Sequence, residues 1–141
     1  MGKYRLSHTA LSDIEDVLRY SQVQFGPQTG IRYQALIRTA IEDLAETPDR
    51  VGSSPRDELS EGLRSFHLTC VRKQAATATG TVQRPRHVVF YRLADDQVIE
   101  IVRILHDAME VRQHLTLELR GSERRKKTRQ KAGFSRYPEN S

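Results

Sequence analysis

The feature that most constrains the fold is a pair of apolar runs near residue 100, separated by a short polar link. Val88–Leu93 and Val98–Leu105 have the length of β-strands, and their Val, Ile, Phe and Tyr residues suit a pleated, buried surface. The link Ala94–Gln97 contains two adjacent aspartates and is short enough to close an antiparallel hairpin. A chain built around this hairpin must form a sheet and supply elements that cover it.

Basic groups interrupt the hairpin at Arg86, Arg92, Arg103 and His106. Side chains alternate between the two faces of a strand, so Arg86 and Arg92 are expected to share one face. The same alternation predicts that Arg103 lies on the face of Ile99, Ile101 and Leu105. It predicts that Glu100 lies on the opposite face with Val98, Val102 and Ile104, and is therefore a poor partner for Arg103.

The first half of the chain predicts a short strand followed by two helices. Tyr4–Leu6 alternates as a strand does, and Ser7 stands where a helix N-cap belongs. The first helix is expected from His8 to about Gln24, and Gly26-Pro27 ends it and begins a second helix that runs from about Gln28 to Glu46. The predicted apolar stripes are Leu11, Ile14, Val17, Leu18 and Phe25 on the first helix, and Tyr33, Ile37, Ala40, Ile41 and Leu44 on the second.

Between and after these elements the sequence is less regular. Residues 48–62 are rich in Pro, Gly, Ser and charge and predict an irregular surface loop, and Leu63–Leu68 predicts a strand. Residues 70–85 contain almost no large apolar side chain, which indicates an extended hairpin or a mobile loop. Asp107–Leu115 predicts a short helix anchored by Met109, Val111 and Leu115, and residues 116–141 predict a basic, disordered tail.

The order of elements indicates an α+β domain over residues 1–115. An N-terminal helical hairpin is expected to pack on a mainly antiparallel four-stranded sheet, followed by a short C-terminal helix. The first strand is separated from the others by two helices, so it is expected to return beside the later strands, where it is free to pair in parallel with one of them.

Composition narrows the class of protein. Residues 1–115 hold 15 basic and 15 acidic side chains, whereas residues 116–141 hold 8 and 3, so the net charge of +5 belongs to the tail. A single cysteine, Cys70, fits a reducing cytoplasm and is expected to be a packed or idle side chain. No segment has the length and apolarity of a signal peptide or a membrane-spanning helix, so a cytoplasmic protein is expected.

Several segments, in this order, resemble the RelE/ParE superfamily of type II toxins over about residues 4–115. They are Tyr4–Ser7 leading into a helix, Leu44–Pro48, Gly62–Phe66, His87–Arg92 and Ile101–Met109. The Arg-Ile-Leu-His ending of the last strand, before a short Met-containing helix and Arg112–Leu115, is closer to the ParE branch than to the RelE branch. Residues 70–85 and the basic tail depart from the compact pattern of the family.

The resemblance implies the toxin of a type II toxin–antitoxin system, neutralised by a cognate antitoxin. ParE-like members inhibit DNA gyrase by binding and stabilise its cleavage complex with DNA, whereas RelE-like members are ribosome-dependent endonucleases of mRNA. Fold alone does not choose between the branches. A third alternative is a non-toxic protein that serves as an antitoxin-binding co-repressor.

Ribonuclease chemistry would need a base, an acid and positive charge at the phosphate. The candidates are Arg64, Arg92, Arg103 and His106, with His67, Arg112 and His114 as further possibilities. No lysine lies between residues 74 and 125, and the helix after the last strand has no tyrosine. The set is therefore thin, which favours binding of gyrase through Arg64, Arg92, Arg103, His106 and Arg112. The alternative is that the arginines are structural and that His106 caps the following turn.

The remaining expectations concern partners. The resemblance implies that an antitoxin segment covers the helical hairpin, with Leu11, Ile14, Leu18, Tyr33 and Ile37 as candidate contacts. No cofactor is expected, and the spacing of His67 and Cys70 gives no metal site. The basic run Arg124–Lys127 could contact phosphates of a nucleic acid, and the alternative is a solvated tail.

Overall fold

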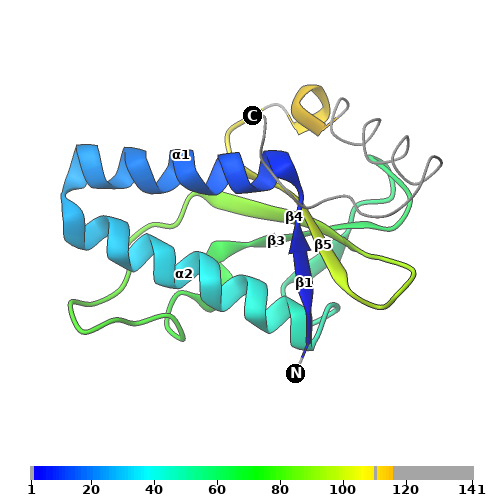
Figure 1. The fold of residues 1–141 in the computed structure, drawn as a ribbon, viewed down its shortest axis with the longest axis horizontal. Helices are drawn as coiled ribbons and strands as arrows, with labels where there is room; N and C mark the ends of the chain where they lie inside the picture. The colour runs from blue at the N-terminus through cyan, green and yellow to red at the C-terminus, as the bar shows by residue number, and fades with distance from the viewer. Residues whose placement is uncertain (1, 110, 116–141) are drawn as a thin grey trace.

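The computed structural model describes residues 2–109 and 111–115 of the chain. Two antiparallel helices cover one face of a mixed sheet (Figure 1). The elements are, in order, β1 (Tyr4–Leu6), α1 (His8–Phe25), α2 (Pro27–Glu46), β2 (Ser53–Pro55), β3 (Leu63–His67), the 3₁₀ turn η1 (Leu68–Val71), β4 (His87–Leu93) and β5 (Ile99–His106). The strand order is β1-β5-β4-β3-β2, with β1 parallel to β5 and the other neighbours antiparallel. The predicted α+β class, helical hairpin and parallel return of the first strand are confirmed.

The sheet has five strands where four were predicted. The additional strand, β2, lies within residues 48–62, which were expected to be irregular, and it pairs with Arg64–Phe66 of β3. Its sequence, Ser-Ser-Pro, has no strand preference of its own. β2 is an edge strand, where a proline is tolerated because one row of backbone groups needs no partner. Pairing with β3, which the local sequence does not reveal, therefore creates this element.

Ser7 begins α1 and also joins it to the sheet. Its Oγ accepts a hydrogen bond from Ala10 N at 2.9 Å, as the N-cap prediction requires, and donates one to Val102 O of β5 at 2.9 Å. Between the helices Gly26 has a φ of +99°, which a residue without Cβ adopts at little cost, and Pro27 opens α2. One hydroxyl thus fixes both the start of α1 and its position against β5.

The apolar stripe of α2 is buried as predicted, but the end of α1 is not. Tyr33, Ile37, Ala40, Ile41 and Leu44 all belong to the core, together with Leu36. Phe25, predicted to lie on the buried face of α1, is 67 % exposed. The hairpin extends past the strands in Figure 1, so the last turns of α1 have no sheet beneath them. Tyr20, Val23 and Ile31 are exposed at the same tip.

A β-bulge in β5 changes the predicted alternation of its side chains. Phe90 pairs with Arg103 and the next residue, Tyr91, pairs with Ile101, which leaves Val102 as an extra residue. Ile104 therefore joins Ile99 and Ile101 in the core under the helices. Leu105 instead joins Val102 on the opposite face. The predicted faces of Ile104 and Leu105 were wrong because one inserted residue reverses the alternation beyond it.

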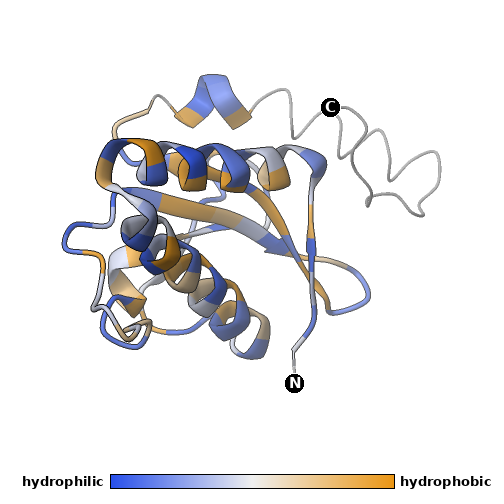
Figure 2. Ribbon diagram, turned by 60° about the vertical axis from the view of Figure 1, so that its left-hand side comes forward, coloured by the Kyte–Doolittle hydropathy of each residue, from blue (hydrophilic) through white to orange (hydrophobic). Residues whose placement is uncertain are grey.

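The face of the sheet away from the helices carries a second, smaller apolar cluster. Leu63, Phe90, Val102, Leu105 and Leu115 are buried there, with Val111 packed against them. Asp107 and Ala108 form a turn and residues 111–115 are helical, so the helix predicted from Asp107 begins later. Leu115 is the buried anchor that was expected, whereas Met109 is exposed. The strands that separate the two clusters are largely apolar (Figure 2).

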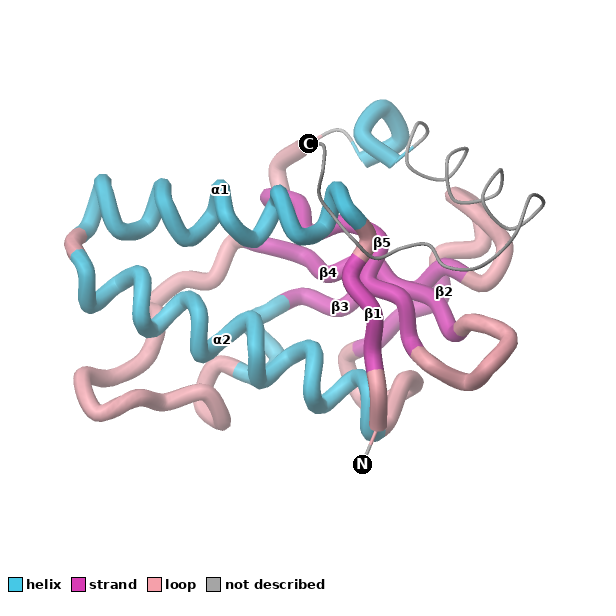
Figure 3. Tube along the Cα trace, in the orientation of Figure 1, coloured by secondary structure: helices cyan, strands magenta, loops and turns pink. Residues whose placement is uncertain are grey.

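The connection between β3 and β4 is not the extended hairpin that was one of the two predictions. β3 ends at His67, η1 follows it, and β4 begins only at His87. Inside the loop, Thr77 and Gly80 form an isolated bridge, and Ala75 and Val82 pack against the main core. The loop runs beside the first half of α2 (Figure 3). It is thus attached to the helical layer and not to a longer pair of strands.

No helix in the described part of the chain is both long and apolar enough to cross a lipid bilayer. The predicted disordered tail, residues 116–141, lies outside the described residues.

Candidate functional site

Arg64, the first of the candidate basic residues, lies on the helix-facing side of β3. Its Nε donates to Ser53 Oγ at 2.8 Å, and its Nη2 donates to Ser53 O at 3.3 Å. Ser53 Oγ is also hydrogen-bonded to the hydroxyl of Tyr91, which donates to Pro48 O. Because Tyr91 is fully buried, this network fixes the loop before β2 on the sheet. Arg64 therefore has a structural role and keeps part of its surface exposed.

Arg92 lies on the opposite face of the sheet. Its cross-strand partners are Leu63 on β3 and Glu100 on β5. Arg92 is 8 % exposed, and its Nε lies 3.9 Å from Glu100 Oε1, beyond hydrogen-bonding distance. Neither its Nε nor its Nη2 forms a hydrogen bond within the described part of the chain. The two charges lie side by side in a buried position, which indicates mutual charge compensation.

Arg103 binds α1 and the C-terminal helical segment. Its Nε and Nη2 donate to the two carboxylate oxygens of Asp13 at 2.8 and 2.9 Å, and its Nη1 donates to His114 O at 2.9 Å. Asp13 Oδ2 also accepts from Ile104 N. Glu100 is not the partner of Arg103, as predicted, although the bulge places the two residues on the same face of β5 and not on opposite faces. The guanidinium forms a bidentate ion pair and is not directed at a free surface.

His106 belongs to a cluster of three histidines, His67, His87 and His106, that was not predicted as a group. His106 and His87 face each other across β4 and β5, with ring centroids 5.3 Å apart. His67, at the end of β3, bonds through Nε2 to Asp107 Oδ2 at 3.0 Å, and Arg86 donates to both oxygens of the same carboxylate. The cluster brings together one end of each of the three central strands.

The hydrogen bonds of the cluster leave no imidazole nitrogen free to act as a base. Nδ1 of His67 accepts from Thr69 N, and Nδ1 of His106 accepts from Ala108 N, so His106 caps the turn as one alternative predicted. The Tyr33 hydroxyl accepts from Arg86 N and is therefore available to donate to Nδ1 of His87 at 2.7 Å. The other nitrogen of each neutral ring carries the proton. The cluster therefore suits a structural clamp better than a proton-transfer site.

The charges of the cluster follow from the same contacts. Burial, followed by the nearby His106, lowers the pKa of His87 from 6.5 to about 4. Hydrogen bonds from Arg86 and His67 lower the pKa of the Asp107 carboxyl well below its usual range. Burial raises the pKa of the Tyr33 hydroxyl. Near neutral pH, therefore, His87 is uncharged and Asp107 is ionised.

The candidate ribonuclease residues do not form one site. Arg64 and Arg92 lie on opposite faces of the sheet, because their cross-strand partners Tyr91 and Leu63 belong to different apolar clusters. Arg103 is hydrogen-bonded to Asp13 of α1, and of the four main candidates only His106 lies in the histidine cluster, beside the further candidate His67. Of the further candidates, Arg112 and His114 are exposed on the C-terminal helical segment, and Cys70 is exposed after β3.

One sequence signal could have revealed the histidine cluster. His87 begins the first strand of the hairpin and His106 ends the second, so antiparallel pairing brings them opposite each other. The partner of Arg103 had no such signal, because Asp13 lies on a helix 90 residues earlier in the chain.

The candidate antitoxin contacts divide into two groups by exposure. Leu11, Ile14 and Leu18 on α1 are half-buried and present part of their surface to solvent. Tyr33 and Ile37 on α2 are 6 % and 3 % exposed, so both are part of the core. A partner lying on the hairpin would therefore contact the α1 residues, with Tyr33 and Ile37 supporting them from below.

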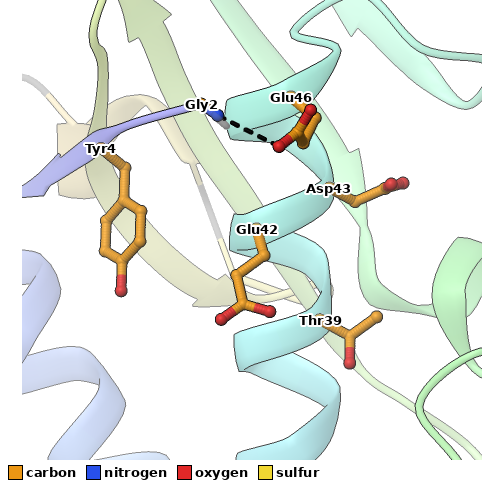
Figure 4. A pocket seen from close by; sticks show the side chains of 6 residues that line it. All are labelled: Gly2, Tyr4, Thr39, Glu42, Asp43 and Glu46. Carbon is orange, nitrogen blue, oxygen red and sulfur yellow. Dashed lines mark hydrogen bonds between the residues drawn. The ribbon is translucent and has the colours of Figure 1, made fainter.

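An open hollow of about 490 Å³ lies between β1 and the end of α2, lined by Gly2, Tyr4, Thr39, Glu42, Asp43 and Glu46 (Figure 4). Glu46 accepts a hydrogen bond from Gly2 N, and Asp43 is paired with Arg50. Glu42 points toward the hollow opposite Tyr4. Carboxylates at a helix C-terminus oppose the helix dipole, so these contacts offset an unfavourable position. The hollow gives this end of α2 an acidic character.

Comparison with known proteins decides the family. The family model described as the ParE toxin of the type II toxin–antitoxin system parDE matches residues 4–111. Toxin ParE1 of Caulobacter vibrioides is 35 % identical over 115 residues, which cover 82 % of this chain and 99 % of that protein. The chain belongs to the ParE toxin family. Toxin ParE1 of Mycobacterium tuberculosis is 26 % identical over 114 residues, covering 81 % of this chain and 98 % of the relative.

A solved structure supports the ParE fold. A chain of the chromosomal ParDE toxin–antitoxin system from P. aeruginosa superposes with a TM-score of 0.55 at 16 % identity, covering 75 % of this chain and 96 % of the other. The family model and the relative from Caulobacter vibrioides confirm the predicted resemblance to the RelE/ParE superfamily and to its ParE branch. The protein is a toxin of a type II toxin–antitoxin system.

Proposed function

We propose that this ParE toxin inhibits DNA gyrase by binding and that it has no catalytic activity of its own. The observation that carries the proposal is the distribution of its candidate catalytic groups. Arg64 and Arg92 lie on opposite faces of the sheet, and Arg103 is paired with Asp13. The acceptor nitrogens of His67, His87 and His106 are occupied. Binding requires none of these groups to transfer a proton.

The test uses purified gyrase, relaxed or supercoiled plasmid DNA, ATP and the full-length chain. We expect loss of supercoiling activity together with accumulation of cleaved DNA, because a stabilised cleavage complex leaves the broken strands covalently held. Full supercoiling with no cleaved DNA at a large molar excess of the toxin would refute the proposal.

The absence of catalysis has a separate test. A message translated in vitro in the presence of the chain is expected to remain intact in primer extension. Codon-dependent cleavage of that message would show a ribosome-dependent endonuclease and would overturn the non-catalytic part of the proposal.

The target surface is proposed to include Arg112, with Arg64 and His106 contributing their exposed parts. Arg92 is buried, and Arg103 is largely covered and paired with Asp13, so both would act only by positioning the strands and the C-terminal helical segment. Arg112→Gln is expected to weaken gyrase inhibition, whereas Gln113→Ala, its exposed neighbour, is expected to leave it unchanged. Equal inhibition by the wild type and both variants would remove Arg112 from the surface.

A cognate antitoxin is proposed to cover α1 through Leu11, Ile14 and Leu18. These residues are partly exposed although they are apolar, and they lie on one side of a helix that has only two fully buried residues. Ile14→Lys is expected to reduce copurification of the toxin with the product of the adjacent reading frame, whereas Arg19→Glu is expected to preserve it. Unchanged copurification of the Ile14 variant would place the antitoxin elsewhere.

A further inference from the structure

The loop between η1 and β4 carries positive charge without any acidic residue. No aspartate or glutamate occurs from Gly62 to Ala94, while six arginines and lysines occur in that range. Four of the six, Arg72, Lys73, Arg84 and Arg86, lie in residues 72–86, which we call the 72–86 loop. A run of this length without a carboxylate gives a local excess of positive charge in a domain, residues 1–115, whose total charge is zero.

The 72–86 loop is held against α2 by specific contacts. Arg32 of α2 donates to Thr79 Oγ1 at 3.1 Å and to Thr79 O at 2.7 Å. Arg72 donates to Val82 O across the loop, and Arg86 N donates to the Tyr33 hydroxyl of α2. Arg32 thereby adds a fifth cation beside the loop, so its positive groups stand on a supported surface.

Two cations of the loop are available to a partner. Arg86 is paired with Asp107, and Arg72 uses part of its guanidinium on Val82 O. Lys73 and Arg84 are exposed, and no ion pair joins either of them to a carboxylate among residues 2–109 and 111–115. They lie toward the two ends of the loop, on either side of its tip.

The surroundings of these cations fit an extended polyanion. An open hollow of about 270 Å³ at the base of the loop is lined by Thr69, Cys70, Arg72, Lys73 and Gln74, with no carboxylate. Residues 75–81 have no side chain larger than threonine, which lets a partner approach the backbone closely. Hydroxyls, lysine and arginine are the groups that contact phosphates in proteins that bind DNA.

We propose that the 72–86 loop contacts the phosphate backbone of duplex DNA through Lys73 and Arg84. The loop has no aromatic residue on which an unpaired base could stack, which disfavours a single-stranded partner. It contains neither a helix nor a β-ribbon that could enter a major groove, so the contact is independent of sequence. Direct contact with DNA goes beyond the proposed inhibition of gyrase. One part rests on that proposed function: that the DNA contacted in the cell is the segment held by gyrase.

The test measures binding of the full-length chain to a fluorescent 20-base-pair duplex of random sequence over a series of salt concentrations. The variant is Lys73→Gln with Arg84→Gln. The matched control is Lys3→Gln with Arg19→Gln, which removes the same charge from two other exposed positions. The basic tail is present in the wild type, the loop variant and the control, so its contribution to DNA binding cancels in the comparison.

The loop variant is expected to bind more weakly and to reduce the slope of log affinity against log salt by about 1.8, corresponding to two lost phosphate contacts. The control is expected to keep the wild-type slope. Equal slopes for the wild type and the loop variant, or an equal loss in the control, would overturn the proposal.

Two further outcomes would also overturn it. Tighter binding of a single strand than of the duplex would identify a different ligand. Loss of binding to gyrase in the absence of DNA, with duplex affinity unchanged, would show that the loop contacts an acidic protein surface. Because the DNA assay contains no gyrase, failure of the proposed function in the supercoiling assay would not affect its result.

Discussion

Asp13 is the residue on which α1, β5 and the C-terminal helical segment depend together. Its carboxylate accepts two hydrogen bonds from Arg103 and one from Ile104 N, and Arg103 reaches on to His114 O. Both side chains of the pair are largely buried. Removing one partner of such a pair leaves a charge without compensation in a place that water reaches poorly.

Asp13→Ala is therefore expected to lower the free energy of unfolding by about 3 kcal/mol. Asp16 lies three residues later on the same helix. Asp16→Ala removes an exposed ion pair with Arg19 and is expected to lower the free energy of unfolding by less than about 0.5 kcal/mol. Urea unfolding monitored by circular dichroism compares the two. Equal losses would contradict a special role for the Asp13–Arg103 pair.

His87 gives the domain a pH dependence with a definite sign. The folded chain keeps His87 neutral down to a pH of about 4, whereas the unfolded chain protonates it near 6.5. The unfolded state therefore binds more protons between these values, and stability falls as pH decreases through this window. The charged and titratable groups around His87 are His67, His106, Arg86 and Asp107. The pKa of Asp107 is lowered, so the stability that this carboxylate contributes is lost only below about pH 3.8, outside the window of His87.

We expect the midpoint of urea unfolding to fall from pH 7 to pH 5 in the wild type and to fall less in His87→Gln. His114→Gln, at an exposed position, is expected to keep the wild-type dependence. The measurement is a series of urea titrations at half-unit pH intervals. Parallel curves for wild type and His87→Gln would show that His87 is not the group responsible.

At the scale of elements, Leu115 is the buried side chain of the C-terminal helical segment, which also contacts the sheet through Val111 and the Arg103–His114 hydrogen bond. Leu115 is buried in the second apolar cluster with Leu63, Phe90, Val102 and Leu105. Leu115→Ala is expected to cost about 2–3 kcal/mol, because the removed atoms leave a space that the sheet fills only in part. Met109→Ala, at an exposed site on the preceding turn, is the control and is expected to stay within about 0.5 kcal/mol of wild type. Thermal unfolding of the two variants measures both losses, and equal losses would contradict the role of Leu115 as the anchor.

The elements that the sequence predicts well are those determined by local chemistry. The serine cap of α1, the Gly-Pro junction and the stripe of α2 each depend on neighbouring residues, and each appears as expected. β2 and the bulge at Val102 depend on pairing with distant strands, so Ser53–Pro55 and the faces of Ile104 and Leu105 were not predictable. The candidate site follows the same division. The capping role of His106 depends on residues next to it in the chain. The positions of Asp13 beside Arg103 and of Glu100 beside Arg92 depend on tertiary structure.

At the scale of the whole molecule, the helical hairpin is longer than the sheet that supports it. Its inner half contributes Leu36 and Leu44 to the core, while Tyr20, Val23, Phe25 and Ile31 are exposed at the tip. Substitutions at the tip are therefore expected to change the stability of the fold little, although the tip lies on the same two helices.

Val23→Ser combined with Phe25→Ser is expected to change the free energy of unfolding by less than about 1 kcal/mol, because both residues remain mostly exposed to water in the folded chain. Leu36→Ala in the same hairpin is expected to cost about 2–5 kcal/mol. Differential scanning calorimetry measures both. A large loss in the tip variant would mean that the tip is covered in solution, for example by a second copy of the chain.

The parallel pairing of β1 with β5 has a consequence for synthesis of the protein. Tyr4 pairs with Ile99, and Leu6 pairs with Ile101, so the first strand emerges from the ribosome long before its neighbour exists. Contacts between such distant residues form late and slowly. The hairpin of α1 and α2, which packs on β5, likewise lacks its support until residue 104 has been made. A toxin with this topology completes its fold only after β5 has been made, and until then the nascent chain exposes apolar helices to any chaperone or partner already present.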